Sequence, residues 1–591
     1  MEEDLEKIIA LAGNKNRYQF FIVTLSFLFW ININFFSITL PYLEQTYLIS
    51  YYDKDSGETK VESISYDICE NKEMNYEIVK YFNNSWVIEQ KLECSKFLTG
   101  LIGSFTFTGN TLGAILYPIF SKFLSQKKIL MFGTLLLIVF MTLSIFINEY
   151  IFYFVILILG NIGCNLTCYS SLTLTQEVTI NHLRGIFGGI LNFGFSICGI
   201  FYSLLFMNIN NWKYIFLICI IFLLVLGIIS LFLVAEAPRT CLNKNFEDFI
   251  ETVKKISKFN GKYEEFTKKI QEDEYTKILE KLKGFEFDYS NKENETEESD
   301  ENNENFQEEE NLRNPNLMLI MNNNIMKGSE RDNSKSSERI QIMNPLDELQ
   351  INKEREKNND KINKKEKKKK SKISYLALIK YPSIRYKFII MSIIWFFNQG
   401  IYSGLNIGIK SLPGNIYING IIGYSSDIIS YVVGPIIIEI KYFGRKKTGI
   451  YSYIFSTIFL IILLIFINYD TLSIIFYFIV HFFVAIPYSL FFTYCLEIYP
   501  TVIRHIGFGL NATMGNIGGI VVPLVIEYLP RRVIYLVYAI LTGICSFLFL
   551  FLEETLGKNL PETIKEVEEE KKKKKKKRRK KNQNEDQGKN D

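Results

Sequence analysis

The amino-acid sequence predicts an all-α polytopic membrane protein whose twelve transmembrane helices form two six-helix pseudo-repeats. Three observations support this fold class. The chain of 591 residues is 48% hydrophobic and contains 49 Phe and 35 Tyr. Its charged residues are confined to a few blocks, and the apolar runs between them are long enough to cross a bilayer core of about 30 Å. Two distant segments also resemble one another, which indicates an internal duplication.

Each apolar run is expected to form one span, because about 20 residues at a rise of about 1.5 Å cross the hydrocarbon core. Short buried helices of a soluble protein could imitate one or two such runs, but not twelve. The predicted spans are 18–41, 97–121, 128–148, 150–173, 186–208, 213–235, 385–409, 415–440, 448–468, 471–496, 504–529 and 532–552.

The spans divide the chain into two bundles, 18–235 and 385–552, separated by a long polar loop. Within that loop, about 244–283 shows helical periodicity. The stretch of about 285–372 is acidic, then Asn-rich, then lysine-rich, and we expect it to be disordered because it has too little apolar surface to bury. The complete predicted order is N-terminus 1–17, first bundle 18–235 with an outer loop 42–96, loop 236–384, second bundle 385–552 and tail 553–591.

Both termini are predicted to be cytoplasmic. An even number of spans places them on one side, and the short loops on that side carry more Lys and Arg than the short loops opposite. Lys15 and Arg17 before the first span agree with this orientation. The N-terminus opens acidic and amphipathic, so we expect no cleaved signal peptide, and we expect the plasma membrane as the location.

The tail contains eleven consecutive basic residues, Lys571 to Lys581. Two interpretations remain open. The run could be a solvated low-complexity tail, or it could bind anionic lipids, with about 1 kcal/mol for each basic residue near the membrane surface. We expect no binding of nucleic acid.

The nine cysteines predict one disulfide and no metal site. Seven lie in or beside the spans, where Cys usually acts as a small apolar residue. Cys69 and Cys94 share the outer loop with a glycosylation sequon at Asn83, so we expect a Cys69–Cys94 bridge and a glycan at Asn83. The chain has only three His, and we find no nucleophile–base pair, metal cluster or phosphate loop. We therefore expect no cofactor and no enzyme.

The internal repeat has an offset of 320 residues. EVTINHLRGIFGG, which begins at Glu177, aligns with EIYPTVIRHIGFG, which begins at Glu497. Equivalent loops carry charges in both halves, and these could latch the cytoplasmic ends of the two bundles together in an outward-open state. The alternative is positive-inside topology with charge compensation at helix ends. The candidate gating charges are Lys127, Lys128, Glu177, Arg184, Glu236, Arg445, Lys446, Glu497, Arg504 and Glu554.

Several motifs occur together in the second half. They are WFFNQGIYSGLNIGIKSLPGNIYIN (Trp395–Asn419), EIYPTVIRHIGFG (Glu497–Gly509) and EETLGKNLPET (Glu553–Thr563). The first half adds GNKNRYQ (Gly13–Gln19), SWVIEQKLEC (Ser85–Cys94) and AEAPRTCL (Ala235–Leu242). In combination these motifs resemble the organic cation/anion/carnitine transporter family of the major facilitator superfamily. The resemblance implies the major facilitator fold and transport by alternating access.

The chain departs from that family at positions expected to form its gating network. The usual acid after the second span is Lys122, and the matching position in the second half is Lys441. The usual fourth-span Arg is Ile156. The eleventh-span position that is Asp in cation-carrying members and Arg in anion-carrying members is Asn516 here, so the charge selector is neutral.

Ionisable residues inside the spans are costly, so each is a candidate functional residue. Asp427 lies well inside the eighth span and matches the family's acidic position. It could couple to substrate or gating, or form a structural hydrogen bond. His481 in the tenth span could be a core histidine or a proton-linked switch. Aromatic rings could contact a cation, or could simply pack. The candidate substrate-binding residues are Trp395, Asn398, Tyr402, Asp427, Tyr488 and Asn516.

The sequence therefore predicts a transporter of a small organic solute, with an organic cation or zwitterion favoured because Asp427 is the clearest buried charge. A sugar or polyol carrier of the same superfamily is one alternative, although the seventh-span amide pair expected for it is only Asn398-Gln399. A membrane scaffold or sensor that does not transport is the other alternative. The long insert and basic tail would then bind its partners.

Overall fold

The computed structural model describes residues 2–13, 17–53, 58–63, 69, 76–80, 85–147, 149–179, 181–272, 274–283, 376–500 and 503–557. Three features predicted above lie outside these residues: the segment 285–372, the sequon at Asn83 and the basic run Lys571–Lys581. The side chain of Arg184 is also not described.

The first half consists of long helices joined by short turns, as the apolar runs predict. The first span is broken at Asn34, whose backbone (φ −85°, ψ 10°) separates two helices. The break leaves a polar side chain in the middle of an otherwise apolar span. The helices are α2 (Arg17–Ile33), α3 (Phe35–Leu43), α6 (Lys96–Phe123), α7 (Gln126–Phe146), α8 (Tyr150–Val178), α9 (Asn181–Asn208) and α10 (Trp212–Leu233).

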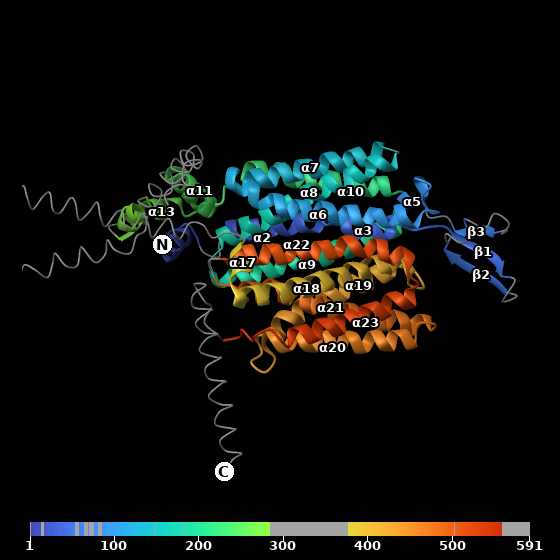
Figure 1. Ribbon diagram of the computed structural model, residues 1–591. Helices are drawn as coiled ribbons and strands as arrows, with labels where there is room; N and C mark the ends of the chain where they lie inside the picture. Colours follow the sequence, from blue (N-terminus) through green and yellow to red (C-terminus); the bar gives the residue numbers. More distant parts are fainter. Residues whose placement is uncertain are drawn as a thin grey trace, which may run out of the picture. The chain divides into compact units, whose positions relative to one another are not determined.

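The second half repeats the same pattern of six long helices. They are α18 (Pro382–Gly408), α19 (Ile416–Glu439), α20 (Gly444–Ile465), α21 (Asp470–Ile498), α22 (Arg504–Tyr528) and α23 (Arg531–Phe549). The two halves meet where α6 packs on α22 and α9 packs on α19 (Figure 1). The predicted fold class is confirmed by this arrangement.

Ten helices of the described chain are long and apolar enough to cross a membrane. They account for ten of the twelve predicted spans. The other two predicted spans correspond to α6 and α9, which are 28 residues long but are not among those ten. Both of these helices pack against the other half, α6 on α22 and α9 on α19.

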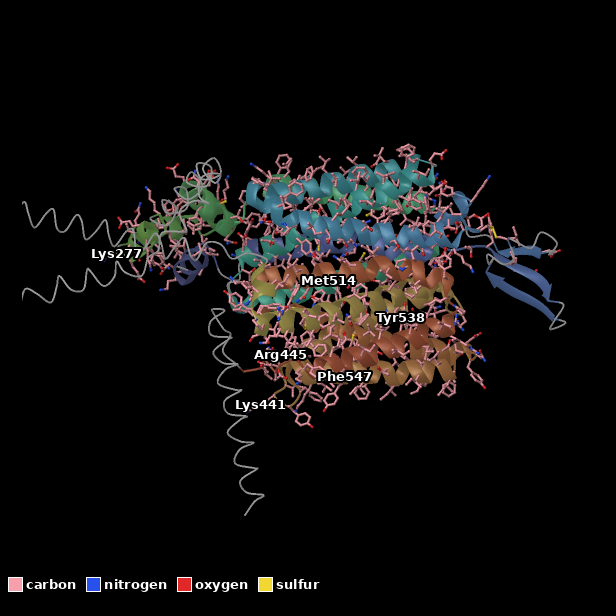
Figure 2. The ribbon with its side chains drawn as sticks, viewed as in Figure 1. Lys277, Lys441, Arg445, Met514, Tyr538 and Phe547 are labelled. Atoms are coloured by element: carbon pink, nitrogen blue, oxygen red, sulfur yellow. A yellow bond between two sulfur atoms is a disulfide. The ribbon has the colours of Figure 1, made fainter. Side chains whose placement is uncertain are left out.

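The bundle surface carries large apolar side chains, as a lipid-facing surface would. Phe547, at 58% exposed, points away from the helices in Figure 2. Phe146 and Phe232 are 74% and 76% exposed. Apolar surface on this scale is rare in soluble monomers, and a bilayer is the medium that would cover it.

The segment between α3 and α6 contains a small antiparallel sheet with strand order β2-β1-β3, which the sequence reading did not anticipate. The strands are β1 (Leu48–Asp53), β2 (Glu58–Ser63) and β3 (Tyr76–Lys80). A disulfide joins Cys69 and Cys94 in the same segment. We call the end of the bundle at which α3 ends and α6 begins the sheet end, and the opposite end the N-terminal end.

Short helices lie at the N-terminal end. They include α1 (Glu2–Leu11), α11 (Pro238–Lys244), α12 (Phe246–Phe259), α13 (Tyr263–Lys269) and α17 (Leu376–Lys380), and residues 274–283 are also helical. Tyr18 anchors this group to the first span: its backbone N–H donates to Asn260, and its hydroxyl accepts from the backbone of Ala235. At the other end, α5 (Trp86–Glu89) and the 3-10 helix η1 (Ile409–Ser411) border the sheet end.

Candidate functional site

A cavity of about 160 Å³ lies between the two halves. Helices of both halves line it: α2, α3, α6, α8 and α9 from the first, and α18, α19, α21 and α22 from the second. Aromatic rings and carboxamides dominate the lining. The aromatic lining residues are Trp30, Phe107, Tyr169, Phe195, Trp395, Tyr402, Tyr424, Tyr431, Tyr488 and Phe508. The carboxamides are Asn34, Asn110, Asn165, Gln399, Asn406 and Asn516.

The structure brings four of the six candidate substrate-binding residues together at this cavity: Trp395, Tyr402, Tyr488 and Asn516. Asn398 and Asp427 do not line it. Asn398 is 1% exposed and accepts a 2.8 Å hydrogen bond from the hydroxyl of Tyr453.

Asp427 is fully buried one side chain behind the cavity wall. Its Oδ2 accepts a 2.7 Å hydrogen bond from the hydroxyl of Tyr402, and Tyr402 forms part of the wall. Its Oδ1 lies 3.0 Å from Nδ1 of His481, which is also fully buried. The ring of Tyr488 stacks on that of Tyr402 at a centroid distance of 5.2 Å. Tyr402 therefore connects the buried carboxylate to the cavity wall.

A charged cluster joins the two halves at the sheet end of the bundle. Lys410 Nζ donates to Glu44 Oε2 at 2.8 Å and to Glu527 Oε1 at 2.5 Å. Glu44 belongs to the first half, whereas Lys410 and Glu527 belong to the second. Burial raises the pKa of Glu44 to about 7; the positive charge of Lys410 opposes the shift and Glu527 adds to it. One lysine therefore joins the halves through two acids.

Close helix packing also joins the two halves at the sheet end. A Cβ on Gly199 of α9 would lie 2.2 Å from the ring of Tyr424 on α19, so the two helices meet without space for a side chain. Ser104 of α6 donates a 2.7 Å hydrogen bond to the carbonyl of Ile520 on α22. In the residues described, the sheet end is thus where contacts between the halves are tight.

Equivalent charges make equivalent contacts in the two halves at the N-terminal end. Lys127 Nζ donates to the carbonyls of Leu231 and Val234, at the end of the sixth helix. In the second half, Lys446 Nζ donates to the carbonyl of Leu550, 319 residues after Leu231. Each lysine therefore ties the start of the third helix of its half to the end of the sixth helix of the same half.

The acids after the sixth helices follow the same symmetry. Glu236 accepts from Ser125 Oγ at 2.8 Å, and Glu554 accepts from the backbone N–H groups of Arg445 and Lys446. For Glu554, desolvation raises the pKa, but the hydrogen bonds from the backbone outweigh it and the pKa falls below its usual value.

Glu177 and Glu497 each accept hydrogen bonds from groups of their own half. Glu177 accepts from the N–H and hydroxyl of Thr240. Glu497 accepts from Arg445 at 3.0–3.1 Å and from the hydroxyl of Thr555 at 2.5 Å. Figure 2 shows Arg445 at the end of the second-half helices. Glu497 thus pairs with Arg445, another of the candidate gating charges.

The structure says less about the other three candidate gating charges. Lys128 is exposed. Arg504 begins α22, and only the backbone of Arg184 is described, in α9.

Sequence reasoning missed the first-half share of the lining and the sheet-end cluster. A usable signal existed: Asn34, Asn110 and Asn165 are polar side chains inside apolar spans. Lys410 lies between two predicted spans, and this position alone does not reveal that it is buried between two acids. Among the described residues, no group of three His, Cys, Asp or Glu could hold a metal ion.

Two family models match the chain. The model described as "Sugar (and other) transporter" matches residues 18–292, and that described as "Major Facilitator Superfamily" matches residues 427–584. Together they cover spans of both halves. The chain therefore resembles these transporters in both halves.

Similar curated proteins carry organic-ion transporter names. Solute carrier family 22 member 6-A of Xenopus laevis is 35% identical over 206 residues, which are 34% of this chain and 36% of the relative. The organic cation transporter protein of Drosophila melanogaster is 28% identical over 195 residues, 32% of this chain and 35% of the relative. The matches thus span about a third of the length of these relatives. They confirm the predicted resemblance to the organic cation/anion/carnitine transporters.

Solved structures of transporters share this fold. The partially occluded inward open conformation of the xylose transporter XylE from E. coli matches with a TM-score of 0.55 and 12% identity. The match covers 91% of this chain and 100% of that protein. The inward open conformation of XylE gives a TM-score of 0.54 at 13% identity, over 92% of this chain and 98% of that protein.

Proposed function

We propose that this protein carries a small organic cation or zwitterion across a membrane by alternating access. The observation that carries the proposal is the cavity between the halves, whose wall includes a tyrosine hydrogen-bonded to a buried carboxylate. The match to the superfamily model and the relatives named for organic cations and organic anions support a solute of this general class.

The proposed preference for a cationic solute follows from the residues that line the cavity. Aromatic rings attract cations through their faces, by about 0.5–2 kcal/mol each. Trp30, Trp395 and the stacked pair Tyr402–Tyr488 supply such rings, and the described lining contains no Lys or Arg. Asp427 supplies the negative charge nearest to the cavity. Asn516 can accept or donate a hydrogen bond with a cationic or an anionic solute, so it does not discriminate between them. The preference for a cation then depends on the aromatic rings and on the carboxylate of Asp427.

Alternating access requires one end of the cavity to close while the other opens. The Glu44–Lys410–Glu527 cluster and the Gly199–Tyr424 contact support a state closed at the sheet end. In this state the described partners of Lys127, Glu236, Arg445, Lys446, Glu497 and Glu554 lie in their own halves. We propose that, when the sheet end opens, charges such as Glu177 and Glu497 exchange these partners for partners across the halves, as the predicted latch requires.

The orientation is part of the proposal. The sheet end faces the extracellular side of the plasma membrane and both termini face the cytoplasm. The Cys69–Cys94 disulfide supports this, because such bonds persist in oxidising compartments. In this orientation a glycan at Asn83 would lie on the extracellular side. The basic run Lys571–Lys581 would lie on the cytoplasmic side, where it binds anionic lipid.

One observation favours a second candidate. Six carboxamides line the cavity, and a neutral polyol would use such groups for hydrogen bonds to its hydroxyls. Under this candidate, Asp427 only positions Tyr402. A sugar or polyol should then be transported as well by Asp427→Asn as by the parent protein.

The test is uptake of organic cations, zwitterions, anions and sugars by proteoliposomes containing the full chain. We expect a monovalent organic cation to be taken up best. Asn516→Asp should strengthen this preference and Asn516→Arg should abolish it, because the substituted side chain lines the cavity. Exclusive uptake of anions, or no uptake at all, would reject the proposal.

A further inference from the structure

An open groove of about 710 Å³ lies beside the start of the first span. One part of its lining comes from α2, as Arg17, Phe20, Phe21 and Thr24. The spacing i, i+3, i+4 and i+7 places these residues on one face of the helix. Because seven residues of helix rise by about 10 Å, this face runs from the charged start of the span into the hydrocarbon region. The α2 side of the groove is therefore basic at the membrane surface and largely apolar below it.

The rest of the lining comes from the turn that follows α12, where Phe259, Asn260 and Lys262 lie. Asn260 fixes this turn to the span, because its Oδ1 accepts a 2.8 Å hydrogen bond from the backbone N–H of Tyr18, 242 residues earlier in the chain. The ring of Phe259 lies 5.3 Å, centroid to centroid, from the rings of Tyr18 and Phe21. Two distant segments thus bring one cation each, Arg17 and Lys262, to the same groove.

Both cations are available to an anion from outside the chain. Arg17 is exposed and Lys262 is half-buried. Among the residues that the structure describes, neither the guanidinium of Arg17 nor the ammonium of Lys262 makes a hydrogen bond or an ion pair. The charge of Lys262 acts on the carboxylate of Glu265, but that carboxylate pairs with Lys269 at 2.9 Å. Positive-inside topology alone would explain Arg17, but it would not explain a second cation held beside it by the loop.

Aromatic rings remain exposed next to these cations. Phe20 is 54% exposed and Phe259 is 37% exposed. A free phosphate ion or an acidic peptide would neutralise the two cations but would leave the rings and the lower part of the groove uncovered. A phospholipid meets both requirements, because its anionic headgroup is joined to acyl chains that bury apolar surface.

We infer that this groove binds one anionic phospholipid, with the headgroup phosphate at Arg17 and Lys262 and an acyl chain along Phe20, Phe21 and Thr24. The guanidinium can donate two N–H groups to phosphate oxygens, and the ammonium adds a second positive charge. In the proposed orientation this end of the span faces the cytoplasmic leaflet, which contains the anionic lipids. The site is separate from the solute cavity and shares no lining residue with it. A lipid bound there contacts both α2 and the turn after α12, so it holds the loop helices against the first span.

The experiment compares two lipids on the purified full chain by native mass spectrometry. The protein in detergent is titrated with phosphatidylserine or with phosphatidylcholine of the same acyl chains, in concentrated ammonium acetate that screens exposed basic runs. We expect the first phosphatidylserine to bind roughly tenfold more tightly than phosphatidylcholine, because two basic residues act on its net charge. Glycerophosphoserine, the same headgroup without acyl chains, should not displace it at an equal concentration.

Paired variants separate the groove from the other basic segments. Arg17→Gln with Lys262→Gln should abolish the preference for phosphatidylserine. Lys277→Gln with Lys283→Gln is the matched control: it removes two exposed charges of the same loop that do not line the groove, and it should behave as the parent. Arg17→Lys with Lys262→Arg keeps both charges and should keep the preference. Phe20→Ala should weaken binding of both lipids severalfold, because the acyl chain loses a contact that the two lipids share.

Equal affinities of the parent for the two lipids would overturn the inference. A preference that survives Arg17→Gln with Lys262→Gln would also overturn it and would assign the lipid to another basic segment, such as Lys571–Lys581. Displacement by glycerophosphoserine would show a site for the headgroup alone and would overturn the role of the acyl chain. These measurements do not involve solute uptake, so failure of the lipid site and failure of the proposed function are distinguishable.

Discussion

The hydroxyl of Tyr402 donates a 2.7 Å hydrogen bond to Oδ2 of Asp427, and the ring of Tyr402 forms part of the cavity wall. A single side chain thus touches both the cavity and the buried carboxylate. Asp427 can then influence a solute without being exposed to it, and it remains protected from water while the cavity is empty.

Tyr402→Phe should weaken solute binding while keeping the ring in place. It removes the hydrogen bond to the carboxylate, and bonds to charged groups are worth about 1.5–3 kcal/mol. We expect KM for tetraethylammonium uptake to rise by roughly tenfold or more. Tyr494→Phe is the matched control, because its hydroxyl bonds to the carbonyl of Glu553, away from the cavity. Equal KM values for the two variants would exclude the proposed role of Tyr402.

Lys410→Met should favour opening of the sheet end. The substitution leaves Glu44 and Glu527 together without their shared cation, and removing one partner of a buried ion pair costs about 3–5 kcal/mol. The native Cys168 lines the cavity and reports on access. We expect an impermeant maleimide added at the sheet end to label Cys168 faster in Lys410→Met than in the parent.

The control for that variant is Lys213→Met, which removes a half-exposed ion pair with Glu89. Cys168→Ser defines the background labelling. An unchanged labelling rate in Lys410→Met would show that the cluster does not hold the sheet end closed.

Closure of the sheet end should depend on pH through Glu44. Burial raises its pKa to about 7 in the closed state, and exposure on opening returns the pKa toward about 4.5. The closed state then binds the proton more tightly. The free energy that protonation of Glu44 contributes to closure is fully present below about pH 4.5. It is lost as the pH rises through 7. Maleimide labelling of Cys168 should be severalfold faster at pH 8 than at pH 6, after correction for thiol reactivity with denatured protein.

Glu44→Gln supplies the check on that pH effect. The amide imitates the protonated acid, so labelling should be slow at both pH values. If Glu44→Gln kept the full pH dependence of the parent, another group would be responsible.

Gly199→Ala should block closure of the sheet end by a steric effect. The added Cβ would overlap the ring of Tyr424, so the ring or the two helices would have to shift. We expect transport to fall by an order of magnitude or more, with faster labelling of Cys168. Gly227→Ala is the matched control, since its Cβ would meet Thr134 at 3.8 Å. Normal transport by Gly199→Ala would contradict the close approach of α9 and α19.

The helices were predictable because hydrophobic length alone specifies them. The predicted span 415–440 and the observed α19 (Ile416–Glu439) differ by one residue at each end. The repeat also predicted equivalent charges, and the structure gives Lys127 and Lys446 equivalent carbonyl partners.

The sheet and the cavity were harder to predict because both depend on contacts between distant segments. The strand Leu48–Asp53 pairs with two short strands in a loop with weak alternation. Asp427 was identified as an unusual buried charge, but its separation from the cavity by Tyr402 depends on how α18 and α19 rotate against each other. The burial of Lys410 likewise depends on Glu44, 366 residues away.

The most direct test of the account is uptake of tetraethylammonium by proteoliposomes containing Asp427→Asn, beside the parent and the exposed-acid control Asp470→Asn. The account predicts that Asp427→Asn loses at least an order of magnitude in kcat/KM, while Asp470→Asn matches the parent. Parent-like uptake by Asp427→Asn, in protein that elutes as a single folded species, would contradict it.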